Sequence, residues 1–376
     1  MNSPNRTVPD RCRGLSLVEL MVAITLGVLL TAGMVQLFNA SKLTFRTNDA
    51  LSRVQENGRF ALEMLKRELR EAGATGFCSG RIEVRNHLNT GCAGGTDDFF
   101  NPNRAVVGWE YGGTGRGDAF TLPDDLDPAT ATNGEWDSTS DTADLPDRLS
   151  GLVVPGSDVV VVRRMEPISG VTAEEGPPPN NPNQASINLV GSHGLPDDAI
   201  VLVTNCSFAD LFQNRSNASA SALSTGTGSC SNPGPGNQSI SSVPWSTSYG
   251  SDMQLLNVVQ VAYYIGLNAN GQPGLYRWNM SNGTSAAFAE ELIEGAETMQ
   301  ILYGFSAASP AGDGQSVNNW LTASEVSADG WQQVLALRLA LSVRSPETAD
   351  FDRTQLTFDL ADADIAITGD GRIRQP

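Results

Sequence analysis

The sequence predicts an α+β protein in which a long N-terminal helix packs on an antiparallel β-sheet domain with long loops. Three observations lead to this prediction. An uncharged apolar stretch near the N-terminus continues, without proline, into an amphipathic helical pattern that ends near residue 72. Beyond Gly76, short runs of apolar residues, several of them alternating with polar ones, replace the helical period. Gly (38) and Pro (20) are frequent, which is typical of a chain with many turns and loops.

The first element is an apolar helix that is long enough to cross a membrane. Residues 20–38 form a run of 19 residues without a charge, close to the ~20 residues that a membrane-spanning helix needs. A polar segment over 1–14 precedes it and carries Arg6, Arg11 and Arg13 against one acid, Asp10. Because positive charge favours the cytoplasmic side, we expect the N-terminus to stay in the cytoplasm and the rest to cross outward. We assign residues 15–38 to the transmembrane half of the helix.

The second element is the amphipathic half of the same helix, which we expect over 39–76. Apolar or small residues recur at spacings of three and four, the pattern of one buried helix face. A continuous helix from Leu15 to Ala72 would be about 87 Å long. The residues of the predicted buried stripe are Leu51, Val54, Gly58, Leu62, Leu65, Leu69 and Ala72.

The remaining elements are strands of one β-rich globular domain over 77–376. We expect strands at 157–165, 199–204, 257–266, 275–280, 334–344 and 354–360, of which 257–266 and 275–280 form a hairpin. Residues 174–184 and 213–251 are rich in Pro, Asn, Ser and Gly and are predicted to be loops. These loops could divide the domain into two lobes.

The junction between the polar and apolar segments has a specific motif. Gly14 stands immediately before the apolar stretch, and Glu19 stands five residues into it, in the order Gly-Leu-Ser-Leu-Val-Glu. This arrangement resembles the signature of type IV prepilins. The resemblance implies cleavage by the prepilin peptidase between Gly14 and Leu15, and N-methylation of Leu15. The alternative is a plain signal anchor with an incidental acid, but a carboxylate inside a bilayer costs ~2.5–3.5 kcal/mol.

A second resemblance lies in later parts of the chain. Residues 55–79, 261–277, 292–304 and 334–345 look like segments of PilW-type minor pilins. This resemblance implies a pilin-like fold and a non-enzymatic subunit that primes assembly of a type IV pilus at or near the fibre tip. The implied location is the bacterial inner membrane, single-pass with a periplasmic domain, and then the pilus on the cell surface. The implied partners are other minor and major pilins, the prepilin peptidase and the inner-membrane assembly platform, with the membrane contacted through the N-terminal helix.

Three alternative functions remain open at this point. A minor pseudopilin of a type II secretion system has the same signal, helix and sheet. A tip adhesin or receptor would use the loop-rich middle of the chain to bind a ligand. A membrane-anchored hydrolase would need a catalytic constellation, and the sequence indicates no catalytic residue, cofactor motif or metal motif. The net charge of −18, which becomes −20 once the leader with three arginines and one aspartate is removed, argues against nucleic acid as a partner.

In the prepilin family the glutamate at this position has a role in assembly, and the resemblance assigns that role to Glu19. In a dry bundle of pilin helices, its carboxylate would pair with the amino-terminal cation of a neighbouring subunit. An unpaired charge in such a core is strongly unfavourable. Glu19 is therefore the predicted subunit-assembly residue.

The cysteines predict two disulfides in the exported domain. Cleavage removes Cys12 and leaves four cysteines, which allow three connectivities. Proximity in sequence favours Cys78–Cys92 and Cys206–Cys230. A zinc site built from all four thiolates is the alternative, but there is no C-x2-C pair.

Other candidate groups have weaker signals. Acidic clusters could supply oxygen ligands for calcium, although their spacing is not that of an EF-hand, and we interpret them as solvated loops. An aromatic-rich region could bind a partner or a glycan, and we interpret it as sheet core. His87 and His193 have no obvious nucleophile beside them in sequence. The acidic clusters are Asp97–Asp98 and Asp124, Asp125 and Asp127, and the aromatic residues are Trp245, Tyr249, Tyr263, Tyr264, Tyr276 and Trp278.

Overall fold

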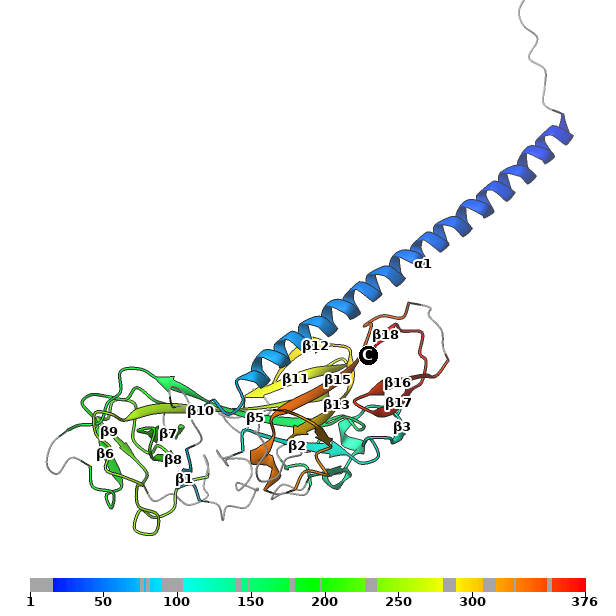
Figure 1. Ribbon diagram of the computed structural model, residues 1–376. Coiled ribbons are helices and arrows are strands. Elements are labelled where there is room, and N and C mark those ends of the chain that lie inside the picture. Colours follow the sequence, from blue (N-terminus) through cyan, green and yellow to red (C-terminus); the bar gives the residue numbers. More distant parts are fainter. Residues whose placement is uncertain are drawn as a thin grey trace, which may run out of the picture.

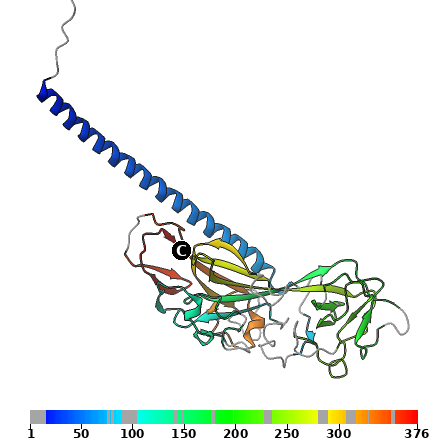
Figure 2. The ribbon, with the colours of Figure 1, turned by 180° about the vertical axis from the view of Figure 1, so that it is seen from behind.

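The computed structural model consists of one long helix that extends away from a β-rich body (Figure 1). The helix reaches the body only with its second half, and the C-terminus lies beside that half (Figures 1 and 2). The α+β prediction is therefore confirmed. The structure describes residues 16–74, 78, 82–89, 104–138, 144–147, 149–175, 180–196, 198–226, 235–279, 289–306, 316–327, 329–349 and 354–376.

Helix α1 (Leu17–Arg70) is a single helix of 54 residues, about 81 Å at 1.5 Å per residue. Its sequence contains no proline or other break, which is why the apolar and amphipathic halves form one rod. The helix ends at a C-cap on Glu71, and Gly73 follows with a positive φ of 74°. The amide of Gly73 then donates to the carbonyl of Arg163 at 2.8 Å, which joins the end of the helix to the sheet.

The largest sheet in the described part of the chain has nine strands in the order β1-β8-β7-β10-β5-β2-β4, with β11 beside β10 and β12 beside β11. We expected an antiparallel sheet, but this sheet is mixed, because β1 runs parallel to β8. The strands are β1 (Val84–Asn86), β2 (Val106–Tyr111), β4 (Trp136–Asp137), β5 (Val159–Ile168), β7 (Ile200–Thr204), β8 (Ala209–Gln213), β10 (Gln254–Leu267), β11 (Pro273–Asn279) and β12 (Ala289–Glu294).

Three smaller sheets complete the described β structure. One has the order β14-β13-β15-β18, one has the order β16-β17-β3 with β3 parallel to β17, and the third pairs β6 with β9. Their strands are β3 (Ala119–Thr121), β6 (Ser186–Asn188), β9 (Ala222–Ser224), β13 (Ala296–Phe305), β14 (Asn319–Leu321), β15 (Ala336–Arg344), β16 (Leu356–Leu360), β17 (Ala363–Ile367) and β18 (Arg374–Gln375). Short 3-10 helices lie at η1 (Pro128–Thr130), η2 (Asn133–Glu135) and η5 (Gly330–Gln333).

The six strands expected from the sequence are confirmed as β5, β7, β10, β11, β15 and β16, and β10 and β11 form the predicted hairpin. The alternating or all-apolar pattern of these segments is what identified them. Of the twelve described strands that the patterns did not predict, seven are two or three residues long, as in β1, β4 and β6, whereas β13 has ten residues. The expected loop over 213–251 contains one of them, β9.

The hydrophobic side chains form two main clusters. The larger one lies between α1 and the strands β2, β5, β10, β11, β13 and β15. The second one surrounds Ile187, Phe212 and Trp245, near β6, β8 and β9. Strand β7 separates them, because Val201 and Val203 face the second cluster while Leu202 faces the first.

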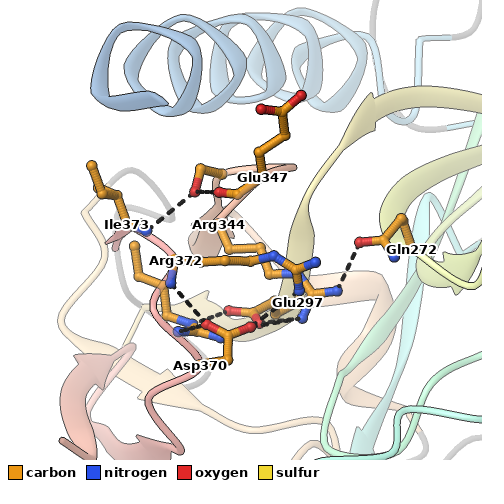
Figure 3. A network of polar contacts seen from close by, with 9 residues as sticks. Gln272, Glu297, Arg344, Glu347, Asp370, Arg372 and Ile373 are labelled. Carbon is orange, nitrogen blue, oxygen red and sulfur yellow. Dashed lines mark hydrogen bonds and ion pairs between the residues drawn. The ribbon is translucent and has the colours of Figure 1, made fainter. Parts of the chain in front are cut away.

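A buried carboxylate holds the C-terminal strand in place (Figure 3). Glu297 of β13 is 1% exposed and binds Arg374 of β18 at 2.8 Å and Arg344 of β15 at 3.0 Å. Asp370 binds the other side of Arg374 at 2.9 Å. Burial acts to raise the pKa of Asp370, but hydrogen bonds from Arg374 and Arg372 outweigh it and lower the pKa. This network fixes three adjacent strands beneath the second half of α1.

Candidate assembly surface

The N-terminus of α1 places Glu19 in a capping box with Ser16. The amide of Ser16 donates to Oε2 of Glu19 at 2.9 Å, and the amide of Glu19 donates to Oγ of Ser16 at 3.4 Å. Glu19 therefore stabilises the first turn of its own helix. The spacing Ser-x-x-Glu is the sequence signal for this motif, and our reading of the sequence missed it. Gly14 and Leu15, the predicted cleavage and methylation residues, lie outside the described residues.

The first half of α1 exposes apolar side chains on all sides. Leu17, Leu30, Leu37 and Phe38 are each more than 60% exposed. The helix is long and apolar enough to cross a membrane, by length and composition. In water such a surface would be strongly unfavourable, so this segment requires lipid or other apolar helices around it.

The second half of α1 docks on the sheet through a narrower face than we predicted. Val54 and Leu65 of the predicted stripe are buried, but Leu51 and Leu62 are 37% and 46% exposed. That part of the prediction is wrong. The buried face of the helix lies about one residue away from the predicted stripe, so that it contains alanines and an ion-paired glutamate in place of some of the leucines. The buried residues of α1 are Ala50, Val54, Ala61, Leu65 and Glu68.

Glu68 is the polar anchor of this docking face. Its side chain is only 8% exposed and binds Nη1 of Arg164 at 2.8 Å. Arg277 of β11 lies 3.9 Å from the other carboxylate oxygen. Arg164 also contacts Glu71 at 3.3 Å and Glu166 at 3.0 Å. The end of the helix is therefore tied to strands β5 and β11 by charge as well as by apolar packing.

The structure corrects the predicted disulfide pairing, because Cys78 bonds to Cys206 across 128 residues. The parallel pairing of β1 with β8, in the register Val84↔Ala209, brings the segment before β1 next to the segment before β8. The pairs Cys78–Cys92 and Cys206–Cys230 are therefore wrong, and a zinc site of four thiolates is excluded because two of the sulfurs are bonded to each other. Cys92 and Cys230 lie outside the described residues.

Neither histidine has the geometry of a catalytic base. His87 is fully buried, and its Nε2 lies 2.6 Å from Oδ1 of Asp210. Oγ of Ser246 donates to the same Asp210 oxygen at 3.0 Å, whereas a nucleophilic triad places the histidine between the serine and the acid. His193 is buried too, and it contacts Oγ of Ser216 at 3.1 Å. Both imidazoles belong to buried polar networks of the second hydrophobic cluster.

The aromatic residues and the described acidic cluster also have structural roles. Five of the six aromatic side chains are at most 3% exposed, which confirms their interpretation as core, and Tyr276 stacks on Tyr264 with ring centroids 5.6 Å apart. Oδ1 of Asp125 accepts from the amide of Asp127, and Asp127 caps η1. Asp97 and Asp98 lie outside the described residues.

Both ends of the chain match models of known protein families. Residues 9–35 match the prokaryotic N-terminal methylation motif. Residues 262–376 match the type IV pilus-assembly protein W, PilW. These two matches support a PilW-type, pilin-like protein. Comparison with curated proteins and with solved structures gives no significant match.

The PilW match covers β11, β13 and β15 together with the C-terminal strands that Glu297 holds under α1. The methylation-motif match includes Gly14, Leu15 and Glu19. The two matches support a minor pilin related to type IV pili, which in general contacts other pilins and is processed by a prepilin peptidase. The chain between residues 36 and 261, including the second hydrophobic cluster, lies outside both matches.

Proposed function

We propose that this chain is a minor pilin that primes assembly of a type IV pilus and occupies a position at or near the fibre tip. The observation that carries the proposal is α1 itself, an unbroken helix with a predominantly apolar first half and a domain docked on its second half. Such a helix can leave the bilayer only into another apolar environment, and a bundle of pilin helices provides one. The methylation motif at its start supports the same route.

The shape of the domain supports a distal position. The part around β6, β8 and β9 projects past the C-terminal end of α1, away from the apolar half (Figures 1 and 2). In a fibre whose helices run along the axis, that part would occupy the space above the end of the helix. A subunit stacked there would collide with it, whereas a subunit at the tip has nothing above it.

The location we propose follows from the same helix. Before assembly the chain sits in the inner membrane with residues 15–38 across the bilayer and residues 77–376 in the periplasm, where a disulfide such as Cys78–Cys206 persists. Cleavage after Gly14 and methylation of Leu15 then prepare it for the fibre. Glu19 would use the carboxylate oxygen that Ser16 does not occupy to pair with the amino terminus of a neighbouring subunit.

Deletion of the chain and its replacement by an epitope-tagged copy test this function. We expect fewer fibres after shearing while the major pilin is still synthesised, and gold label against the tag at fibre ends. Undiminished fibres with a secretion defect would identify a pseudopilin instead. Normal fibres that have lost binding to one surface would identify a tip adhesin.

A further inference from the structure

A groove runs alongside the second half of α1, between the helix and strand β15. It consists of two adjoining hollows of about 640 and 540 Å³, and both are lined by Leu62 of the helix and Leu339 of the strand. Together they follow α1 from Val54 to Arg70. At 1.5 Å per residue this is roughly 24 Å, between about four and five helical turns.

The lining of the groove is apolar and partly uncovered. Leu335, immediately before β15, is 46% exposed, and Leu337 and Leu339 lie at alternate positions of the strand and are half-buried. Farther along, Leu341 and Val343 are buried beneath α1 and the C-terminal strand. A contiguous exposed apolar surface of this kind indicates a binding site for another macromolecule.

The groove is continuous with the apolar half of α1. Because α1 is one straight rod, a second helix packed beside its first half at 8–10 Å would continue beside its second half. Helix-in-groove binding needs an apolar track that accepts side chains at spacings of three and four. Leu62 and Leu69 on the helix, facing Leu335 and Leu337 on the strand, form such a track.

The charges beside the groove select the occupant. Arg59, Lys66 and Arg70 line it and are exposed. The hollow near Val54 also contains two exposed anions, Asp359 and the terminal carboxylate of Pro376. Among the described residues, Arg59 and Arg70 have no ion-pair partner, and Lys66 lies 3.8 Å from Glu63. Residues 39–70 hold seven Lys or Arg and four Asp or Glu, so this helix segment has a net charge of +3. The same segment of a second copy would therefore bring like charge to the hollow that Lys66 and Arg70 line.

We propose that this groove receives the amphipathic half of the N-terminal helix of a different pilin subunit, one that carries carboxylates beside its apolar stripe. The apolar side chains of that helix pack on Leu62, Leu335 and Leu337. Its carboxylates face Arg59, Lys66 and Arg70. The inference rests on the proposed function, because it assumes that pilin helices lie side by side.

Photo-cross-linking of the full chain in pilus-producing cells tests the occupant. A photoreactive phenylalanine analogue replaces Leu335 in the groove, and in a matched control it replaces Val190, which is 73% exposed and lies far from α1 in sequence. We expect Leu335 adducts whose partner peptide comes from residues of another pilin that follow its membrane segment, and we expect no such adduct from Val190. Adducts only to lipid, to a globular domain or to a second copy of this chain would overturn the proposal.

Substitutions then measure the strength of the contact. Leu335→Asp and the double variant Arg59→Glu/Arg70→Glu should each reduce the fibre-associated fraction about fivefold or more at equal membrane levels, which corresponds to about 1 kcal/mol. Val190→Asp should leave that fraction unchanged. If the native chain enters fibres and the groove variants enter equally well, the groove is wrong while the pilus function stands. If the native chain never enters fibres, the proposed function itself fails.

Discussion

Substitution of Glu68 by Gln tests whether a buried ion pair holds the helix on the sheet. Removing one partner of a buried pair costs 3–5 kcal/mol, because the other charge stays buried without compensation. Here Arg164 keeps Glu71 and Glu166, at 3.3 and 3.0 Å and both about half exposed, and glutamine keeps one hydrogen bond to it. We therefore expect a cost at or just below the bottom of that range, about 2–3 kcal/mol.

The control is Glu63→Gln on the same helix. Glu63 is 70% exposed and lies 3.8 Å from Lys66, so its loss should cost less than about 1 kcal/mol. Urea unfolding of the detergent-solubilised chain, followed by the fluorescence of buried tryptophans such as Trp278, gives both values. Equal costs for the two substitutions would refute the role of Glu68 as an anchor.

Three further predictions concern the disulfide, the C-terminal network and the start of the helix. Alkylation without reductant should label no cysteine of the mature chain, and peptide mapping should find Cys78–Cys206; a Cys78–Cys92 peptide would contradict the fold. Breaking the Cys78–Cys206 bond with Cys206→Ser should cost about 5 kcal/mol in the chain-entropy model, since the bond closes a loop with a sequence separation of 128. The pKa of Asp370 is lower in the folded protein than in the unfolded chain, where it is about 4. The ionised carboxylate of Asp370 therefore stabilises the fold above about pH 4, and this contribution is lost as the pH falls through the folded pKa. The urea midpoint of the native chain should drop between about pH 5 and pH 3, and the midpoint of Asp370→Asn should drop less over the same range. Glu19→Gln should insert in the membrane at least as well as the native chain but enter sheared fibres less, and equal entry would show that Glu19 has no assembly role.

The sequence was sufficient for the elements whose pattern is long and regular. Helix α1 and the strands β5, β10 and β15 follow from an unbroken apolar run, an amphipathic stripe and repeated Val or Leu at alternate positions. The face of the helix was harder to predict. Ala50, Ala61 and Glu68 have little or no apolar signal of their own, and they are buried only because the sheet offers a close approach and Arg164 supplies the opposite charge.

Contacts between distant segments were not predictable from spacing. The bond between Cys78 and Cys206 depends on β1, a strand of three residues that pairs in parallel with β8 across more than a hundred residues. The groove has the same origin, because Leu62 belongs to the helix stripe that the sequence predicted to be buried and Leu335 belongs to the predicted strand over 334–344. In the structure both side chains line the groove and are 46% exposed.

The central claim is that this chain becomes a fibre subunit after cleavage at Gly14. The most direct measurement is mass spectrometry of the N-terminal peptide of the chain recovered from sheared and washed fibres. The account predicts a peptide that begins at Leu15 and carries one N-terminal methyl group, and it predicts that a Gly14→Ala variant yields only the longer chain in membranes. A chain that keeps residues 1–14 in the native cells, or that is found in membranes and never in fibres, would contradict it.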